Sequence, residues 1–108
     1  MRITILECAK RHSVVEEEIR VVLSYPVLRI RIAPRRDGAD PYLFIGRYDE
    51  NEPLLEVIAD LAGSDEWVAF HAMMLRPSTI HNLGLELVID ALDLGDTARQ
   101  RPERRDDL

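Results

Sequence analysis

The sequence predicts a single α+β domain with the element order β-α-β-β-β-β-α, a mostly antiparallel four-stranded sheet and helices on one face of that sheet. Three observations lead to this fold class. Runs with an apolar residue at every second position are separated by polar turns, one early segment has helical periodicity, and the later turns are of hairpin length. The 108 residues suffice for one domain, expected over residues 1–94, and residues 95–108 are expected to form a flexible charged tail.

The N-terminal part predicts a strand followed by a helix. Residues 2–7 alternate between apolar and polar side chains, as a short strand does. Ser13 and Glu16 fit a capping box at the start of a helix over residues 13–24, in which Ser13 accepts from a first-turn N–H and Glu16 bonds back. Pro26 ends this helix, because proline disfavours the helical conformation of the residue before it.

Four further strands are expected over residues 27–33, 42–48, 54–61 and 67–75. The polar turn PRRDGADP, with Asp-Gly at its centre, joins the first two into a hairpin. The third run is almost continuously apolar, as a central strand is. Strict alternation along the last strand places the following residues on one face: Trp67, Ala69, His71, Met73 and Leu75.

The C-terminal part predicts a second helix and then the tail. Apolar residues recur at helical spacing over residues 79–94, although Gly84 weakens this helix by about 1 kcal/mol relative to alanine. From residue 95 onward, GDTARQRPERRDDL has no apolar periodicity, so no regular element is expected there.

Composition and charge exclude several classes of protein. A net charge of −6 gives no bulk basic surface for nucleic acid. Lys10 is the single lysine among the 14 basic residues, however, and the planar fork of arginine suits phosphate or carboxylate. Cys8 is the single cysteine, so no internal disulfide can form and a reducing cytoplasm is expected. No apolar run approaches the roughly 20 residues that span a bilayer, and the N-terminus does not fit a signal peptide.

Cationic side chains near strand ends form the candidate active site. Cleavage of RNA needs a base for the 2′-hydroxyl, a cation for the phosphate and an acid for the leaving oxygen. The candidates for these roles are Arg47, His71 and Arg76. His71 and Arg76 lie roughly 17 Å apart along an extended strand, so they can reach one phosphate only if the strand ends after Met73 or Met74.

Two further groups are candidates for RNA binding. Lys10, Arg11 and His12 precede the first helix, where three side chains that can carry positive charge are adjacent in sequence. Arg29 and Arg31 lie on one face of a strand and could follow a phosphate backbone, although acidic groups on neighbouring strands would satisfy them equally.

Structural roles remain open for the three catalytic candidates. His71 also fits a half-buried structural histidine, and Arg47 also fits a surface pair with Asp49 or Glu56, worth about 0–1 kcal/mol. Arg76 could bond the carbonyls of the helix junction or a carboxylate. No metal-ligand spacing and no glycine-rich phosphate loop is present, so neither a metal nor a cofactor is expected.

Several short motifs, taken in order, resemble a known family. They are K-R-H-S-V before E-E-E-I, the strands V-L-R-I-R-I, Y-L-F-I-G-R and L-L-E-V-I-A-D, and a closing strand with an arginine before a helix. Over about residues 8–80 this order of motifs resembles that of the BrnT family. Its members are toxins of type II toxin–antitoxin pairs and have a RelE-like ribonuclease fold. The resemblance implies a RelE-like fold, endoribonuclease activity and a cognate antitoxin as partner. It also implies that Arg47 and Arg76 stabilise phosphate while His71 acts as acid or base.

Three features depart from the family pattern. The last strand reads F-H-A-M-M-L-R rather than I-S-A-R, the C-terminal helix is acidic and apolar rather than basic, and the net charge is negative. These departures leave a second function open, namely a non-catalytic interaction module on the same fold. It would bind a partner protein, or a second copy in a homodimer, through Trp67, the Met73 face and the C-terminal helix.

Overall fold

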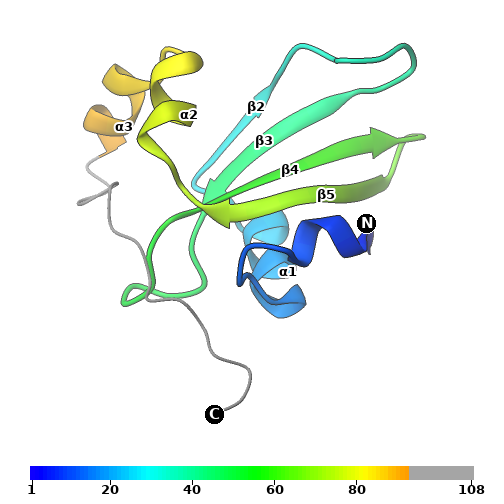
Figure 1. The fold of residues 1–108 in the computed structure, drawn as a ribbon, viewed down its shortest axis with the longest axis horizontal. Coiled ribbons are helices and arrows are strands. Elements are labelled where there is room, and N and C mark those ends of the chain that lie inside the picture. The colour runs from blue at the N-terminus through cyan, green and yellow to red at the C-terminus, as the bar shows by residue number, and fades with distance from the viewer. Residues whose placement is uncertain (93–108) are drawn as a thin grey trace.

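The computed structural model describes residues 1–92, so the tail expected over residues 95–108 lies outside the described part of the chain. The strands form one five-stranded sheet, and Figure 1 shows helices packed against it. In chain order the elements are β1 (Arg2–Ile5), the 3₁₀ helix η1 (Glu7–Lys10), α1 (Glu16–Ser24), β2 (Leu28–Arg31), β3 (Pro41–Gly46), β4 (Leu55–Ala62), β5 (Glu66–Met74), α2 (Pro77–Asn82) and α3 (Glu86–Leu92). The α+β class is therefore confirmed.

The sheet has five strands in the order β1-β5-β4-β3-β2 and is mixed, with three antiparallel pairings and one parallel pairing among the described strands. The four strands β2 to β5 pair with antiparallel neighbours, as expected. The five expected strands are present, but the expected four-stranded size of the sheet is wrong, because β1 adds to the outer edge of β5 in parallel register, from Arg2 opposite Glu66 to Ile5 opposite Ala69. This pairing joins segments more than 60 positions apart in the sequence, so no local pattern predicts it.

Helices cover both faces of the sheet, which corrects the expectation that they share one face. The α1-side core is formed by Ala9, Val14, Ile19, Val22, Leu23, Phe44, Leu55, Val57, Ala59, Trp67, Ala69 and Ala72. The α2–α3-side core is formed by Leu43, Ile45, Leu54, Leu75, Ile80, Leu85 and Ile89. The reason is visible in β3, where Leu43 and Ile45 on one face and Phe44 on the other are all at most 1% exposed. A strand that is apolar on both faces needs a cover on each.

Helix α1 begins later than expected and uses a different cap. Val15 is the N-cap residue, and its backbone N–H donates to the carboxylate of Glu18 at 3.0 Å. The expected capping box of Ser13 and Glu16 is wrong, because Ser13 has a φ of +62° and lies before the helix. Glu16 instead bonds Arg20 at 3.0 Å. The predicted helix end before Pro26 is confirmed, since α1 ends at Ser24.

A β-bulge interrupts the pairing of β4 with β5 and turns the second half of β5 over. Ile58 pairs with His71 and Ala59 pairs with Ala69, so Phe70 is an extra residue on β5. Trp67 and Ala69 therefore face the α1-side core, whereas His71 faces the opposite side with Ile58. The expected placement of Trp67, Ala69 and His71 on one face is wrong for this reason.

The expected helix over residues 79–94 is two helices within the described residues. Helix α2 ends in a Schellman motif, in which the N–H of Leu85 bonds the carbonyl of Ile80 at 2.9 Å and the N–H of Gly84 bonds that of His81 at 3.1 Å. Gly84 adopts a φ of +65°, which this motif requires, and α3 then starts at Glu86. Leu85 and Ile80 both belong to the α2–α3-side core, so the break lets α3 fold back onto the sheet.

Replacing Gly84 with alanine should lower the free energy of unfolding by about 1 kcal/mol, because a side chain at positive φ clashes with its own backbone. A Cβ at this position meets nothing within 4 Å, so the effect is conformational rather than a packing clash. Gly84→Asn is the matched control and should cost less, since asparagine tolerates this conformation. Urea denaturation at neutral pH measures the free energy of unfolding of both variants. Equal stability of the alanine variant and the wild type would contradict the Schellman motif with a positive φ at Gly84.

Candidate functional site

A carboxylate is completely buried on the central strand of the sheet. Glu56 lies on β4 with 0% exposure, between Ile45 of β3 and Met73 of β5. It faces the side that carries α2 and α3, since Ile45 belongs to the α2–α3-side core. A buried, ionised carboxylate is costly unless charged or polar groups bond to it.

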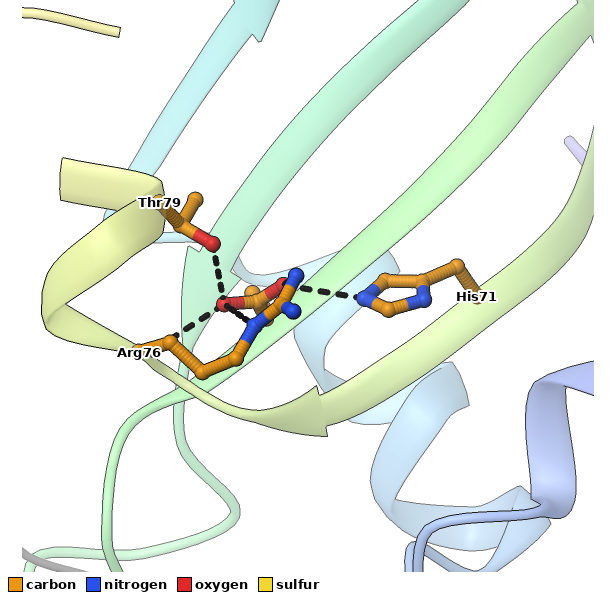
Figure 2. Close-up of polar contacts among 4 residues, drawn as sticks. His71, Arg76 and Thr79 are labelled. Atoms are coloured by element: carbon orange, nitrogen blue, oxygen red, sulfur yellow. Dashed lines mark hydrogen bonds and ion pairs between the residues drawn. The ribbon is translucent and has the colours of Figure 1, made fainter. Parts of the chain in front are cut away.

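Three residues donate five hydrogen bonds to this carboxylate, and Figure 2 shows His71, Arg76 and Thr79 converging on it. The Nε2 of His71 lies 2.9 Å from Oε2, and Thr79 Oγ1 donates to Oε1 at 2.7 Å. Arg76 donates three times, from Nη2 to Oε2 at 2.8 Å, from its backbone N–H to Oε1 at 3.0 Å and from Nε to Oε1 at 3.3 Å. Glu56, His71, Arg76 and Thr79 are named the Glu56 cluster below.

These bonds keep Glu56 ionised despite its burial. Burial alone would raise the pKa of the Glu56 carboxyl, but the hydrogen bonds from His71, Arg76 and Thr79 outweigh it and lower the pKa from 4.5 to about 2. In return, the bonded carboxylate raises the pKa of Arg76, which is charged in any case.

The ionised carboxylate also fixes the tautomer of His71. A carboxylate can only accept, so Nε2 of His71 must carry the proton in this contact. In the neutral ring the other nitrogen, Nδ1, is then an acceptor and can serve as a base. The His71 side chain is 23% exposed, so a substrate can reach it.

His71 and Arg76 meet although they are five positions apart on the chain. Strand β5 ends at Met74, and the N–H of Leu75 still bonds the carbonyl of Leu54 at 2.9 Å. Arg76 is then the N-cap residue of α2, so the chain turns there and the arginine side chain folds back over Glu56. Two local features of the backbone therefore bring His71 and Arg76 to the same carboxylate. The bulge at Phe70 sets the face of His71, and the end of β5 at Met74 sets the position of Arg76.

Arg47 lies near the Glu56 cluster without joining it. It follows the last residue of β3, two positions beyond Ile45, which pairs with Glu56. Its side chain is half-buried and makes no hydrogen bond or ion pair with another described residue, so the alternative pair with Asp49 or Glu56 is not formed. Arg47 therefore lies at the same end of the sheet as Arg76, as a cation without an internal partner in the described part of the chain.

The residues before α1 approach the cluster through one histidine. The ring centroid of His12 lies 6.1 Å from that of His71, and the two ring planes are inclined at 58°. Lys10 is held by Glu7 at 3.1 Å and Glu16 at 3.8 Å. Arg11 is exposed.

Arg29 and Arg31 lie on the other side of the sheet. They pair with Phe44 and Tyr42 of β3, and Phe44 belongs to the α1-side core. The guanidinium of Arg29 lies 6.0 Å from the ring centroids of both Tyr42 and Trp67, and Arg31 bonds Asp40 at 2.9 Å. These two arginines share one face, as the alternation predicted, but that face is opposite to the Glu56 cluster.

Two members of the cluster, Glu56 and Thr79, were not among the candidates from the sequence. One signal was present: Glu56 is an acidic residue inside an apolar run that reads as a central strand, and acidic residues are almost never fully buried unless paired. Thr79 carried no signal of its own. Among residues 1–92, no group of three or more histidine, cysteine, aspartate or glutamate side chains could hold a metal ion.

Comparison with protein-family models gives no match, and no curated protein and no solved structure matches the chain either. The resemblance to BrnT toxins therefore rests on the short motifs alone. No helix within the described residues is long and apolar enough to cross a membrane.

Proposed function

We propose that this chain is a metal-independent endoribonuclease and the toxin of a type II toxin–antitoxin pair. It would have a RelE-like fold and act in the cytoplasm. The observation that carries the proposal is the Glu56 cluster, in which a buried carboxylate orients a half-buried histidine beside a half-exposed arginine. The motifs that resemble the BrnT family supply the reaction class.

The cluster offers two of the three groups that RNA cleavage needs. His71 would take the proton of the 2′-hydroxyl at Nδ1, because its Nε2 is committed to Glu56. Arg76 would stabilise the charge on the phosphate: Glu56 occupies Nε and Nη2, which leaves Nη1 on a side chain that is 44% exposed. Arg47, at the same end of the sheet, would add a second cation.

The positions of the basic residues favour one path for the RNA. His12 lies beside His71, and Lys10 and Arg11 directly precede it on the chain, so RNA in contact with the cluster can extend toward this segment. Arg29 and Arg31 lie on the opposite face, so the same strand of RNA does not reach them without passing the sheet edge. RNA binding is therefore assigned to the first group.

A second candidate function is a non-catalytic interaction module, with a cognate antitoxin, another protein or a second copy as partner. The observation that favours it is the exposed apolar surface of α2 and α3, to which Leu83, Leu87, Val88 and Leu92 contribute with exposures of 41%, 84%, 38% and 41%. A net charge of −6 also favours a protein partner over RNA. In the toxin proposal the same surface is a candidate for the antitoxin contact.

Induced alone in a bacterial host, the wild type should arrest growth, and the purified protein should cleave RNA in the presence of EDTA. His71→Ala and Arg76→Ala should each lower the rate of cleavage at least about 100-fold, the range for loss of a general base or of a charge-stabilising donor. Arg20→Ala, on the exposed face of α1, is the control and should leave cleavage unchanged. A folded wild type that neither arrests growth nor cleaves RNA would transfer the assignment to the interaction module.

A further inference from the structure

One role in the proposed cleavage has no side chain within the Glu56 cluster, namely protonation of the leaving oxygen. Thr79 already donates its hydroxyl proton to Glu56, and Arg76 does not release protons near neutral pH. We propose that His12 is the general acid that gives the leaving 5′-oxygen its proton, which makes the site a two-histidine centre. This inference rests on the proposed function and assigns His12 a catalytic role rather than RNA binding alone.

The geometry of the two rings fits one phosphoryl group between them. Their centroids are 6.1 Å apart and their planes are inclined at 58°, so the rings are not stacked. Nδ1 of His71 can accept from the 2′-hydroxyl while a ring nitrogen of His12 donates to the 5′-oxygen of the same phosphate, each through a hydrogen bond of about 2.8 Å, when the phosphate lies across the edges of both rings. His12 is exposed and makes no hydrogen bond with another described residue, so its nitrogens are open to a substrate.

The fold holds His12 beside His71 from both sides along the chain. Before His12, the pairing of β1 with β5 extends by one more hydrogen bond, from the N–H of Leu6 to the carbonyl of Ala69 at 3.0 Å. The thiol of Cys8 then donates to the carbonyl of Phe70, the bulged residue next to His71, at 3.2 Å. The same bulge that presents His71 to Glu56 thus anchors the segment that carries His12.

After His12, the backbone turns sharply into the core. Ser13 has a φ of +62° and is the one described residue other than glycine with a positive φ. Such a conformation costs about 1 kcal/mol or more and persists where the surroundings impose it, often at functional sites. The next residue, Val14, is 2% exposed in the α1-side core. The turn lies between the exposed His12 and a buried valine, so it sets the direction in which the His12 side chain projects from the backbone.

The other histidine and the lysine that could supply a proton contact carboxylates outside the Glu56 cluster. The chain has three histidines, and His81 lies on α2 with Nδ1 at 3.3 Å from Glu86 and a side chain that is 84% exposed. Lys10 is paired with Glu7 and Glu16. Histidine is also the side chain whose ordinary pKa, about 6.5, allows it to donate and accept protons near neutral pH.

The step is balanced as a transphosphorylation. The 2′-oxygen attacks phosphorus while its proton moves to Nδ1 of His71, and the bond from phosphorus to the 5′-oxygen breaks while that oxygen takes a proton from the protonated His12 ring. The products are a 2′,3′-cyclic phosphate and a 5′-hydroxyl. Proton exchange with water restores both rings.

The test compares an RNA that the wild type cleaves with the same RNA carrying a bridging 5′-sulfur at the scissile bond, because a thiolate leaves without a proton. His12→Asn should lower kcat/KM at least about 100-fold on the normal RNA and less than about 10-fold on the sulfur RNA. His71→Ala should slow both substrates, and His81→Asn should slow neither. His12→Asn should also abolish the fall of kcat/KM at alkaline pH, which reports the acid.

The outcomes separate this inference from the function on which it rests. An active wild type whose His12→Asn variant is unimpaired, or equally slow on both substrates, overturns the role of His12 and leaves the ribonuclease proposal standing. A wild type that cleaves no RNA overturns both. Circular dichroism of His12→Asn should match the wild type, because the side chain is exposed and outside both cores.

Discussion

Replacing Glu56 with glutamine should lower the free energy of unfolding by about 2–3 kcal/mol and slow RNA cleavage at least about 100-fold. Glutamine keeps the size of the side chain but replaces one acceptor oxygen with an NH₂ donor. In wild type the five hydrogen bonds that the carboxylate accepts come from His71, Arg76 and Thr79, so in either orientation the new NH₂ group faces donors at 2.7–3.3 Å. A buried donor without an acceptor costs about 1–3 kcal/mol, and the charge-assisted bonds to Arg76 weaken at the same time.

The loss of activity has a different cause from the loss of stability. With an NH₂ group opposite Nε2, His71 can relieve the conflict by moving its proton to Nδ1. The nitrogen that should accept the 2′-hydroxyl proton then carries one of its own. A second, distant substitution that raises the thermal stability of the Glu56→Gln variant should therefore not restore cleavage.

Glu56→Ala should cost more, about 3–5 kcal/mol, because it removes the buried partner of Arg76 and leaves a gap in the sheet face. Urea denaturation at pH 7 measures both variants, and a cleavage assay on the folded fraction measures activity. Glu50→Gln, in an exposed turn, is the matched control and should be neutral in both. A Glu56→Gln variant as stable and as active as wild type would show that the carboxylate charge is not required.

Local patterns in the sequence were sufficient for the class of the fold and for most of its elements. The end of α1 before Pro26 and the four strands β2 to β5 follow from periodicity and turn chemistry, which act over a few residues. The errors arise where distant parts of the chain decide. The addition of β1 to β5 joins residues more than 60 positions apart, and the cover of both sheet faces depends on how α3 folds back after Gly84.

The candidate site was predictable as a set of residue types but not as a geometry. The sequence predicts His71 and Arg76 as site residues because these side chains can move a proton and hold a phosphate, and the structure places both on one carboxylate. Strict alternation, however, put His71 on the face of Trp67, and a single extra residue at Phe70 reverses this. A bulge has no sequence pattern of its own, since it depends on what the neighbouring strand presents.

The burial of Glu56 is not predicted from the sequence for a related reason. From the sequence Glu56 was a surface partner for Arg47, because charged residues are usually exposed. Burial of this carboxylate follows from its place on the central strand under α2, which the sequence alone does not reveal. The charge of Glu56 and that of Arg76 also cancel within the cluster, so a local acid–base site is compatible with a negative net charge.

The second large effect expected is a loss of stability on acidification that depends on Glu56. The pKa of this carboxyl is about 2 in the folded protein and near 4.5 in the unfolded chain. Because the folded pKa is the lower one, the unfolded chain takes up the proton first as the pH falls. The stabilisation is therefore complete above about pH 4.5 and is lost between pH 4.5 and 2. A shift of this size corresponds to at most about 3 kcal/mol.

Other carboxylates titrate in the same range, so the measurement is the difference between wild type and Glu56→Gln. Glu18, which is 4% exposed, is present in both proteins, and its contribution cancels in that difference. The arginine that faces Glu56 stays charged throughout, since the contact raises the pKa of Arg76. Urea denaturation at pH 5, 4, 3 and 2.5 should show a gap of about 2–3 kcal/mol at pH 5 that nearly closes at the lowest pH. A difference in the free energy of unfolding that stays constant over this range would mean that His71, Arg76 and Thr79 do not hold the Glu56 carboxyl ionised. His71 would then lack the partner that orients it as a base.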